Sequence, residues 1–132
     1  MAKIIRADFA REDYIKMINE FLFSDSRISL PIEKLKAMKD RLLKAGSSFH
    51  KTFHAYFEFT DNKRYDRLCS REETLVKRIQ RCNADLKGQE KKIFILFWQD
   101  IADIIEADYI ELNVQYLKNS CRYFTYKIRE LA

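Results

Sequence analysis

Glycine and proline are scarce in this sequence. The chain has 132 residues but only two glycines, Gly46 and Gly88, and one proline, Pro31. Average usage would give roughly nine glycines and six or seven prolines in a chain of this length. Tight β-hairpins and β-bulges need glycine at positive φ. The shortage therefore excludes most β-rich folds and favours long helices joined by few, short connections.

Long apolar runs and paired cysteines are also missing. The longest uninterrupted apolar segment, residues 93–98, is far shorter than the roughly 20 residues that span a bilayer. The first residues, MAKIIRADF, are interrupted by charge and lack the apolar stretch of a secretory signal. Cys69, Cys82 and Cys121 are odd in number and show no CxxC spacing, so we expect reduced packing residues. These features predict a cytoplasmic protein that does not enter a membrane.

Apolar and charged residues are abundant. Hydrophobic residues make up 47% of the chain, including ten Phe, seven Tyr and one Trp, and charged residues make up 34%. A chain of this size and composition can bury a core without help from metals or disulfides. We predict an all-α fold, a single-domain helical bundle over residues 1–132 with about five mostly antiparallel helices.

The first three helices are predicted from apolar residues at helical spacing. The first begins at Asp8, whose carboxylate can cap free N–H groups. The second starts around residues 29–31, where a proline is tolerated in the first turn, and ends at Gly46. Ser47 or Ser48 is expected to cap the third helix.

Longer helical segments are predicted in the second half of the chain. After a turn at residues 60–63, a helix extends until Gly88 ends it, although a capping-box spacing leaves open a break near Cys69. The pattern then stays helical over residues 89–132, which is too long for one helix inside a compact domain. We expect a long C-terminal helix or a kinked helix pair that restarts at Asp108.

Four arginines fall on one flank of the predicted fourth helix. At about 100° per residue they lie together beside its apolar face. The set extends over about 21 Å, which is fourteen residues at 1.5 Å each. Only Asp85 is placed at i+4 to pair with one of them, and guanidinium groups suit bidentate contact with phosphate or carboxylate. This arginine strip consists of Arg67, Arg71, Arg78 and Arg81.

A second basic strip is predicted in the C-terminal segment. Lys118, Arg122 and Arg129 align on one helical face, and Tyr126 lies beside them. Basic side chains with a nearby aromatic ring can neutralise a nucleic-acid backbone and stack on exposed bases. The pattern therefore indicates a second binding surface.

A structural interpretation of both strips remains open. Residues 93–117 carry five acids and no base, whereas residues 47–92 carry eleven bases and seven acids. Arginines beside an apolar seam can cover the core edge and pair with acids on a neighbouring helix or subunit. Asp100, Asp103 and Glu106 are the expected partners in that case, and otherwise form a solvated face.

The segment KKIFILFWQDI, residues 91–101, has apolar residues around well over a third of the helix circumference. Such a helix either lies at the centre of the bundle or buries its second face against a partner. We expect central placement, with a homodimer or heteromeric groove as the alternative.

Sequence motifs of catalysis are absent. There is no Gly-rich phosphate loop and no nucleophile elbow. His50, His54 and Glu58 stack at i, i+4 and i+8, a plausible arrangement for a metal, but a further ligand must come from another helix. We expect no enzymatic activity, no metal and no other cofactor.

These observations together predict a non-catalytic helical accessory or interaction protein. Its best-supported partner is nucleic acid or a nucleoprotein assembly, bound through the Arg-rich helix faces. The alternative is a protein–protein adaptor, an inhibitor or an oligomeric subunit that acts through apolar helix faces and complementary charge blocks.

Overall fold

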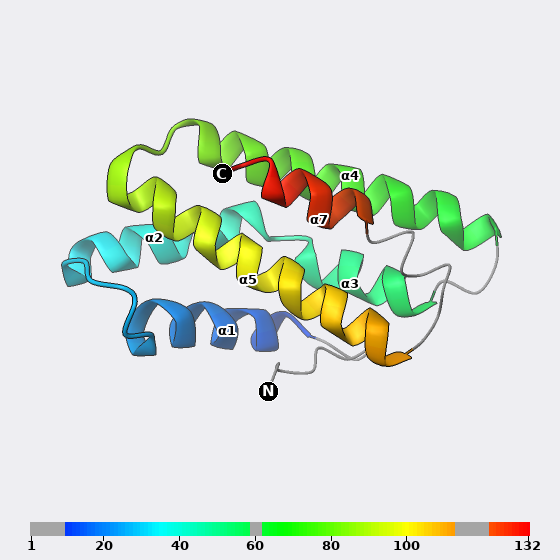
Figure 1. The fold of residues 1–132 in the computed structure, drawn as a ribbon, viewed down its shortest axis with the longest axis horizontal. Coiled ribbons are helices and arrows are strands. Elements are labelled where there is room, and N and C mark those ends of the chain that lie inside the picture. Colours follow the sequence, from blue (N-terminus) through cyan, green and yellow to red (C-terminus); the bar gives the residue numbers. More distant parts are fainter. Residues whose placement is uncertain (1–9, 59–61, 113–121) are drawn as a thin grey trace.

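The computed structural model describes residues 10–58, 62–112 and 122–132, with side chains for 10–55, 66–107 and 123–132. Over these residues the protein is helical throughout and has no strand, so the predicted all-α class is confirmed. The described ranges contain six helices instead of about five, and none of these six has the length and hydrophobicity to cross a membrane. They are α1 (Arg11–Ser24), α2 (Ile32–Ala45), α3 (Phe49–Glu58), α4 (Asn62–Ala84), α5 (Gly88–Leu112) and α7 (Arg122–Arg129) (Figure 1).

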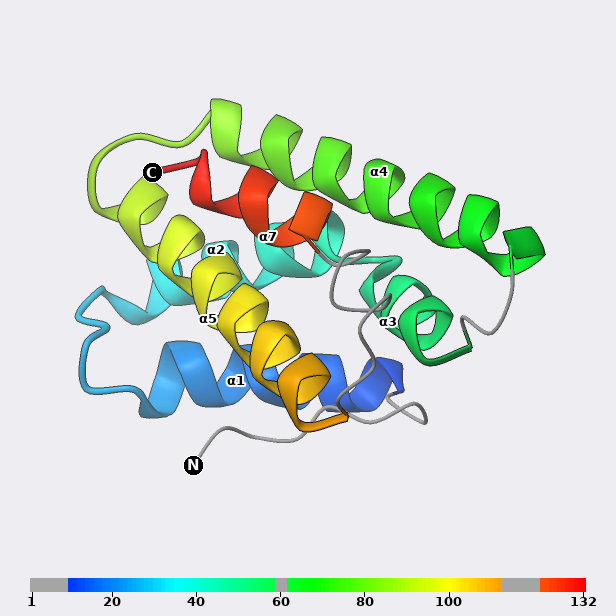
Figure 2. The same cartoon turned by 45° about the vertical axis from the view of Figure 1, so that its right-hand side comes forward.

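The helices form a bundle in which α5 runs diagonally across the others (Figure 1). The last helix, α7, turns back and lies between α4 and α5 in both views, and it contacts both (Figure 2). Helices α2 and α3 also pack against α4, and α1 packs against both α2 and α3. The amino-terminal part of α2 and the amino-terminal part of α5 are joined at the bundle edge by an ion pair, Lys34 Nζ to Glu90 Oε1 at 3.7 Å.

The boundaries of α1 and α2 follow simple local signals. Asp8 lies outside the described residues, but the backbone N–H of Ala10 donates to the carboxylate of Asp13 at 3.0 Å, which stabilises the first turn of α1. Helix α2 begins directly after Pro31 and ends at Ala45, as predicted. The N–H of Gly46 then donates to the carbonyl oxygen of Leu42 at 3.0 Å and closes the last turn.

The long fourth helix is confirmed, and the alternative of a break near Cys69 is not: α4 is continuous through Cys69, with buried apolar residues before and after that position. Two other details of the second half are wrong. Gly88 does not end α4, which stops at Ala84. It is the first residue of α5 and has φ of 63°, a conformation that favours glycine. Helix α5 passes through Asp108 without a restart and ends at Leu112, and within the described residues α7 follows it from Arg122. The predicted turn at residues 60–63 falls mostly outside the described residues, and α4 has already begun at Asn62.

Trp98 of α5 lies at the centre of the hydrophobic core and is fully buried. Its ring contacts Tyr14 of α1, Phe49 of α3 and Phe124 of α7, with ring centroids 6.2, 6.0 and 6.5 Å apart. Phe97, at the preceding position of α5, packs edge-on against Phe21 of α1 with centroids 5.2 Å apart. The apolar faces of α5 are thus buried inside the chain, in agreement with central placement.

Gly46 is required by the close approach of a distant side chain. The hydroxyl of Tyr14 donates a buried hydrogen bond of 2.8 Å to the carbonyl oxygen of Leu42, one turn before Gly46. A Cβ atom at Gly46 would overlap the phenol ring of Tyr14. Burial raises the pKa of the Tyr14 hydroxyl, so it stays protonated and keeps its donor role. The φ of Gly46 is −100°, which any residue adopts, so only the contact with Tyr14 demands glycine here.

The substitution Gly46→Ala tests this contact through the sign of its effect. At an ordinary φ, Gly→Ala should stabilise by about 0.4–1 kcal/mol because it restricts the unfolded chain. We expect Gly46→Ala instead to lower the free energy of unfolding by about 1–3 kcal/mol, because the new methyl group overlaps Tyr14. Urea unfolding measures the difference. A Gly46→Ala variant as stable as the wild-type protein would show that Tyr14 does not pack against this position.

Candidate nucleic-acid interface

The arginine strip lies where the helical pattern of α4 predicts it. Leu68, Leu75 and Ile79 are buried on the apolar face of α4 and hold that face against the core. The strip follows the flank of this face. Arg67 and Arg81 are exposed, while the other two arginines are half-buried. The core contacts of α4 therefore leave the strip at the protein surface.

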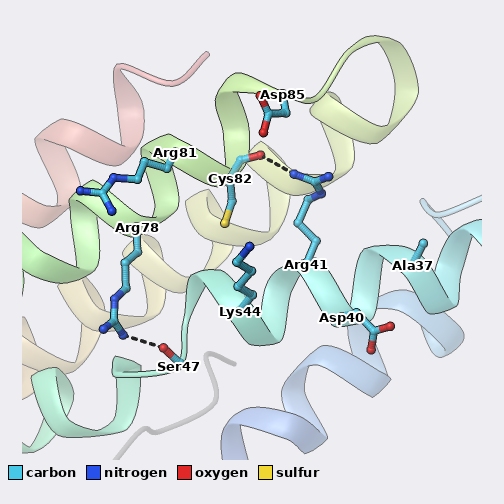
Figure 3. A pocket seen from close by; sticks show the side chains of 9 residues that line it. All are labelled: Ala37, Asp40, Arg41, Lys44, Ser47, Arg78, Arg81, Cys82 and Asp85. Atoms are coloured by element: carbon cyan, nitrogen blue, oxygen red, sulfur yellow. Dashed lines mark hydrogen bonds between the residues drawn. The ribbon is translucent and has the colours of Figure 1, made fainter.

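Arg78 connects the strip to the segment between α2 and α3. Its guanidinium Nη1 donates to the hydroxyl oxygen of Ser47 at 2.6 Å and to that of Ser48 at 3.3 Å (Figure 3). The two serines expected to cap α3 thus accept hydrogen bonds from α4. Thr52 adds a second link, since its hydroxyl donates to the carbonyl oxygen of Arg71 at 3.3 Å. These contacts fix the flank of α4 that carries the strip against α2 and α3.

A groove of about 690 Å³ lies between α2 and α4, and part of the strip lines it (Figure 3). Arg41 and Lys44 contribute two further positive charges from α2. Arg41 Nη1 donates to the carbonyl oxygen of Cys82 at 3.0 Å, in the last turn of α4, where carbonyls lack partners within the helix. The lining residues are Ala37, Asp40, Arg41, Lys44, Ser47, Arg78, Arg81, Cys82 and Asp85.

Sequence reasoning missed the contribution of α2. Arg41 and Lys44 flank the buried Met38 and Leu42 just as the arginines of α4 flank their own apolar face. That pattern is visible in the sequence. The meeting of the two flanks depends on how α2 packs against α4, which helical periodicity does not specify.

Most cations of this surface have no acidic partner among the side chains that the structure describes. Arg67, Arg71, Arg81 and Lys44 take part in none of the ion pairs found there. The pair of Arg81 with Asp85, expected from their i+4 spacing, does not form. Four positive charges are therefore available on one surface for an external anion.

The acidic residues of α5 pair with other arginines. Asp100 Oδ2 lies 2.7 Å from Arg27 in the α1–α2 connection, and Arg27 also binds Asp25 at 2.7 Å and lowers the pKa of that carboxyl. Glu106 Oε2 lies 2.6 Å from Arg129 of α7, and Asp103 lies 3.8 Å from the same guanidinium. Within the described part of the chain, the acidic segment thus does not supply partners for the arginine strip.

The second predicted strip is only partly described. Lys118 and the side chain of Arg122 lie outside the described residues. Tyr126 is 61% exposed, and the ammonium group of Lys127 lies 5.8 Å from the centre of its ring. Arg129 is held by the acids of α5. The candidate interface is therefore limited to α4 and α2, and the C-terminal strip stays a prediction.

The predicted metal ligands show no assembled site among the described side chains. His50 and His54 lie half-buried on α3, and the side chain of Glu58 is not among those described. Burial, together with the nearby charges of Lys51 and Arg11, lowers the pKa of His50. In the ranges that the structure describes, no three His, Cys, Asp or Glu side chains come together.

Comparisons of the chain with protein families, with curated proteins and with solved structures give no match. The chemistry of the site must therefore be inferred from its own residues. Guanidinium and ammonium groups without acidic partners attract anions, and the planar guanidinium fork matches the oxygens of a phosphate or carboxylate. A surface that extends along α4 and into a groove suits an elongated anion with several charges.

Charge-reversal substitutions on α7 and α4 should distinguish an arginine that has an acidic partner from one that has none, through their effects on the free energy of unfolding. Arg129→Glu places like charge against Glu106 and Asp103, so we expect it to lower the free energy of unfolding by up to about 1 kcal/mol. Adding Glu106→Lys should restore part of this loss. The matched reversal Arg67→Glu should change stability by less than about 0.5 kcal/mol. Urea unfolding of the three variants gives these differences, and equal destabilisation by Arg67→Glu would mean that the strip has an acidic partner after all.

Proposed function

We propose that this is a cytoplasmic, non-catalytic helical protein that binds nucleic acid, alone or in a nucleoprotein assembly, through the arginine strip and the adjoining groove. One observation carries the proposal. Within the described residues, Lys44 of α2 and three arginines of the strip have no acidic partner, while Asp100, Asp103 and Glu106 of α5 are paired with Arg27 and Arg129. An evenly mixed surface would be neutral locally, whereas this one attracts polyanions.

The length of the strip suits a nucleic-acid backbone. From Arg67 to Arg81 it extends about 21 Å, and one strand of a helical nucleic acid presents a phosphate about every 3.4 Å along its axis. Several phosphates can therefore lie beside the strip at once. Each neutralised phosphate releases condensed counterions, which supplies affinity without any base contact. The expected binding is sequence-tolerant and strongly dependent on salt.

A second candidate function is a protein–protein adaptor or an oligomeric subunit. Phe23 and Ile32, which flank the α1–α2 connection, are 44% and 62% exposed. Exposed apolar side chains of this size favour contact with a protein. An adaptor would use this end of the bundle, and reversing charges on α4 would leave its partner binding unchanged.

The variant Arg71→Glu/Arg81→Glu tests the nucleic-acid proposal. Neither side chain has an acidic partner among the described residues, and the substitutions leave the Arg78–Ser47 contact in place. We expect the affinity for nucleic acid to fall by more than about tenfold at low salt. The dependence of log Kd on log salt should become shallower by about 1.4–1.8, since each lost contact removes about 0.7–0.9. Fluorescence anisotropy over a salt series measures both quantities.

The matched control is Lys16→Glu/Lys91→Glu, which lowers the formal net charge by the same four units, from +5 to +1. Both lysines are exposed, on α1 and α5, and they belong neither to the strip nor to the lining of the groove. This control should retain most of the wild-type affinity. If both double variants lose affinity equally, net charge alone drives binding, and the strip is not the interface.

A further inference from the structure

The groove between α2 and α4 has two chemically different ends. Two hydrogen bonds set the alignment of the helices, one from Arg78 to Ser47 and one from Arg41 to the carbonyl oxygen of Cys82. The first marks an end lined by cations. The second marks an end where Asp85, the residue directly after α4, also lies (Figure 3).

The cationic end is suited to a phosphate group. Arg78 and Arg81 reach it from α4 and Lys44 from α2, while the hydroxyl of Ser47 already orients Arg78 (Figure 3). Three positive side chains from two helices can surround one phosphate, and a fixed guanidinium loses less freedom when it binds. The groove volume of about 690 Å³ lies within the range of pockets that enclose small molecules, which includes a single nucleotide.

The opposite end is suited to hydroxyl groups. Asp85 lies there beside the guanidinium of Arg41, which already binds the carbonyl oxygen of Cys82, and Asp85 takes part in no ion pair within the described residues (Figure 3). Carboxylates accept hydrogen bonds from hydroxyl and amino donors and repel a second anion. Along α4 the unpaired cations therefore stop at Arg81, and the next charged side chain on this surface is acidic.

We propose that the groove binds the hydroxyl-terminated end of a single nucleic-acid strand. The last phosphate lies between Lys44, Arg78 and Arg81, and the terminal sugar hydroxyls face Asp85. The preceding phosphates follow the arginine strip towards Arg67. This inference rests on the proposed function and adds two restrictions to it, an unpaired strand and an unphosphorylated end.

The preference for an unpaired strand follows from the walls of the groove. A nucleotide that lies between α2 and α4 has both helices beside it, so it cannot remain stacked and paired inside a duplex. Recognition of unpaired nucleotides by charged grooves is the usual mode for single strands. No aromatic side chain of the described residues lines the groove, so no ring is available to stack on the base. We therefore expect little preference for base identity and a larger contribution to affinity from the chemical group at the end of the strand.

The test measures the binding of one oligonucleotide sequence in several forms. Single strands carry a hydroxyl or a phosphate at the 3′ end, or a hydroxyl or a phosphate at the 5′ end, and a blunt duplex is the fifth ligand. We expect wild-type protein to prefer the single strand to the duplex by about tenfold. We also expect a phosphate at one of the two ends, the one recognised, to weaken binding by about tenfold. If a 3′ phosphate weakens binding, the groove holds the 3′ end of the strand. If a 5′ phosphate weakens binding, the groove holds the 5′ end.

Two substitutions locate the effect in the groove. Asp85→Asn should remove the discrimination against the phosphorylated end, whereas Asp66→Asn, an exposed acid of α4 outside the groove, should preserve it. Lys44→Glu should weaken binding of the hydroxyl-ended strand by about tenfold, and Lys36→Glu on the same helix should not.

The possible failures are distinguishable. Salt-dependent binding that ignores both the strand ends and the duplex state would overturn the groove inference and leave the proposed function standing. The groove inference also fails if Asp85→Asn and Asp66→Asn behave alike. If inorganic pyrophosphate competes as well as the oligonucleotide at equal ionic strength, the groove is a simple phosphate site and the strand-end claim is wrong. Absence of binding to every nucleic acid at low salt would refute both proposals.

Discussion

The burial of Trp98 and its neighbours on α5 is the packing constraint on which the rest of the structure depends. Aromatic rings from α1, α3 and α7 meet this side chain, and its indole Nε1 is buried without a hydrogen-bond partner among the described residues. An unmade hydrogen bond of this kind costs about 1–3 kcal/mol, so apolar and aromatic packing must outweigh it. Because α5 takes the centre, α4 and α2 lie outside it with their charged flanks at the surface.

That arrangement also determines how the charges are distributed. The outward face of α5 is acidic, and the segments that pack nearest to it supply Arg27 and Arg129 as partners. The cations of α4 and α2 meet across a groove in which four basic side chains outnumber the two acidic ones, Asp40 and Asp85, so the groove keeps an excess of positive charge. Binding of a polyanion would lower the electrostatic repulsion among these cations. The same packing that stabilises the core thus leaves basic side chains without acidic partners at the surface. Exposed ion pairs contribute little to stability, so this distribution of charge has little effect on the stability of the fold.

Much of this could be predicted from the sequence, and the failures have physical causes. Scarce glycine and proline and the spacing of apolar residues predicted the helices and the strip on α4, because both depend on local periodicity. A glycine after a helix signals a chain reversal, but Gly88 at positive φ begins the next helix and does not end the previous one. The role of Gly46 depends on Tyr14, thirty-two positions away, and the groove depends on Arg41 and Lys44 meeting α4. Such contacts arise from tertiary packing, which single-helix patterns do not contain.

The central claim is that unpaired cations on α4 and α2 hold a nucleic-acid backbone, and the salt dependence of wild-type binding tests it most directly. Four side chains of this surface, Lys44, Arg67, Arg71 and Arg81, have no acidic partner in the described part of the chain. At about 0.7 per phosphate for a single strand, log Kd should rise with log salt with a slope of about 3. A slope near zero, or no binding to a single strand at low salt, would contradict the account.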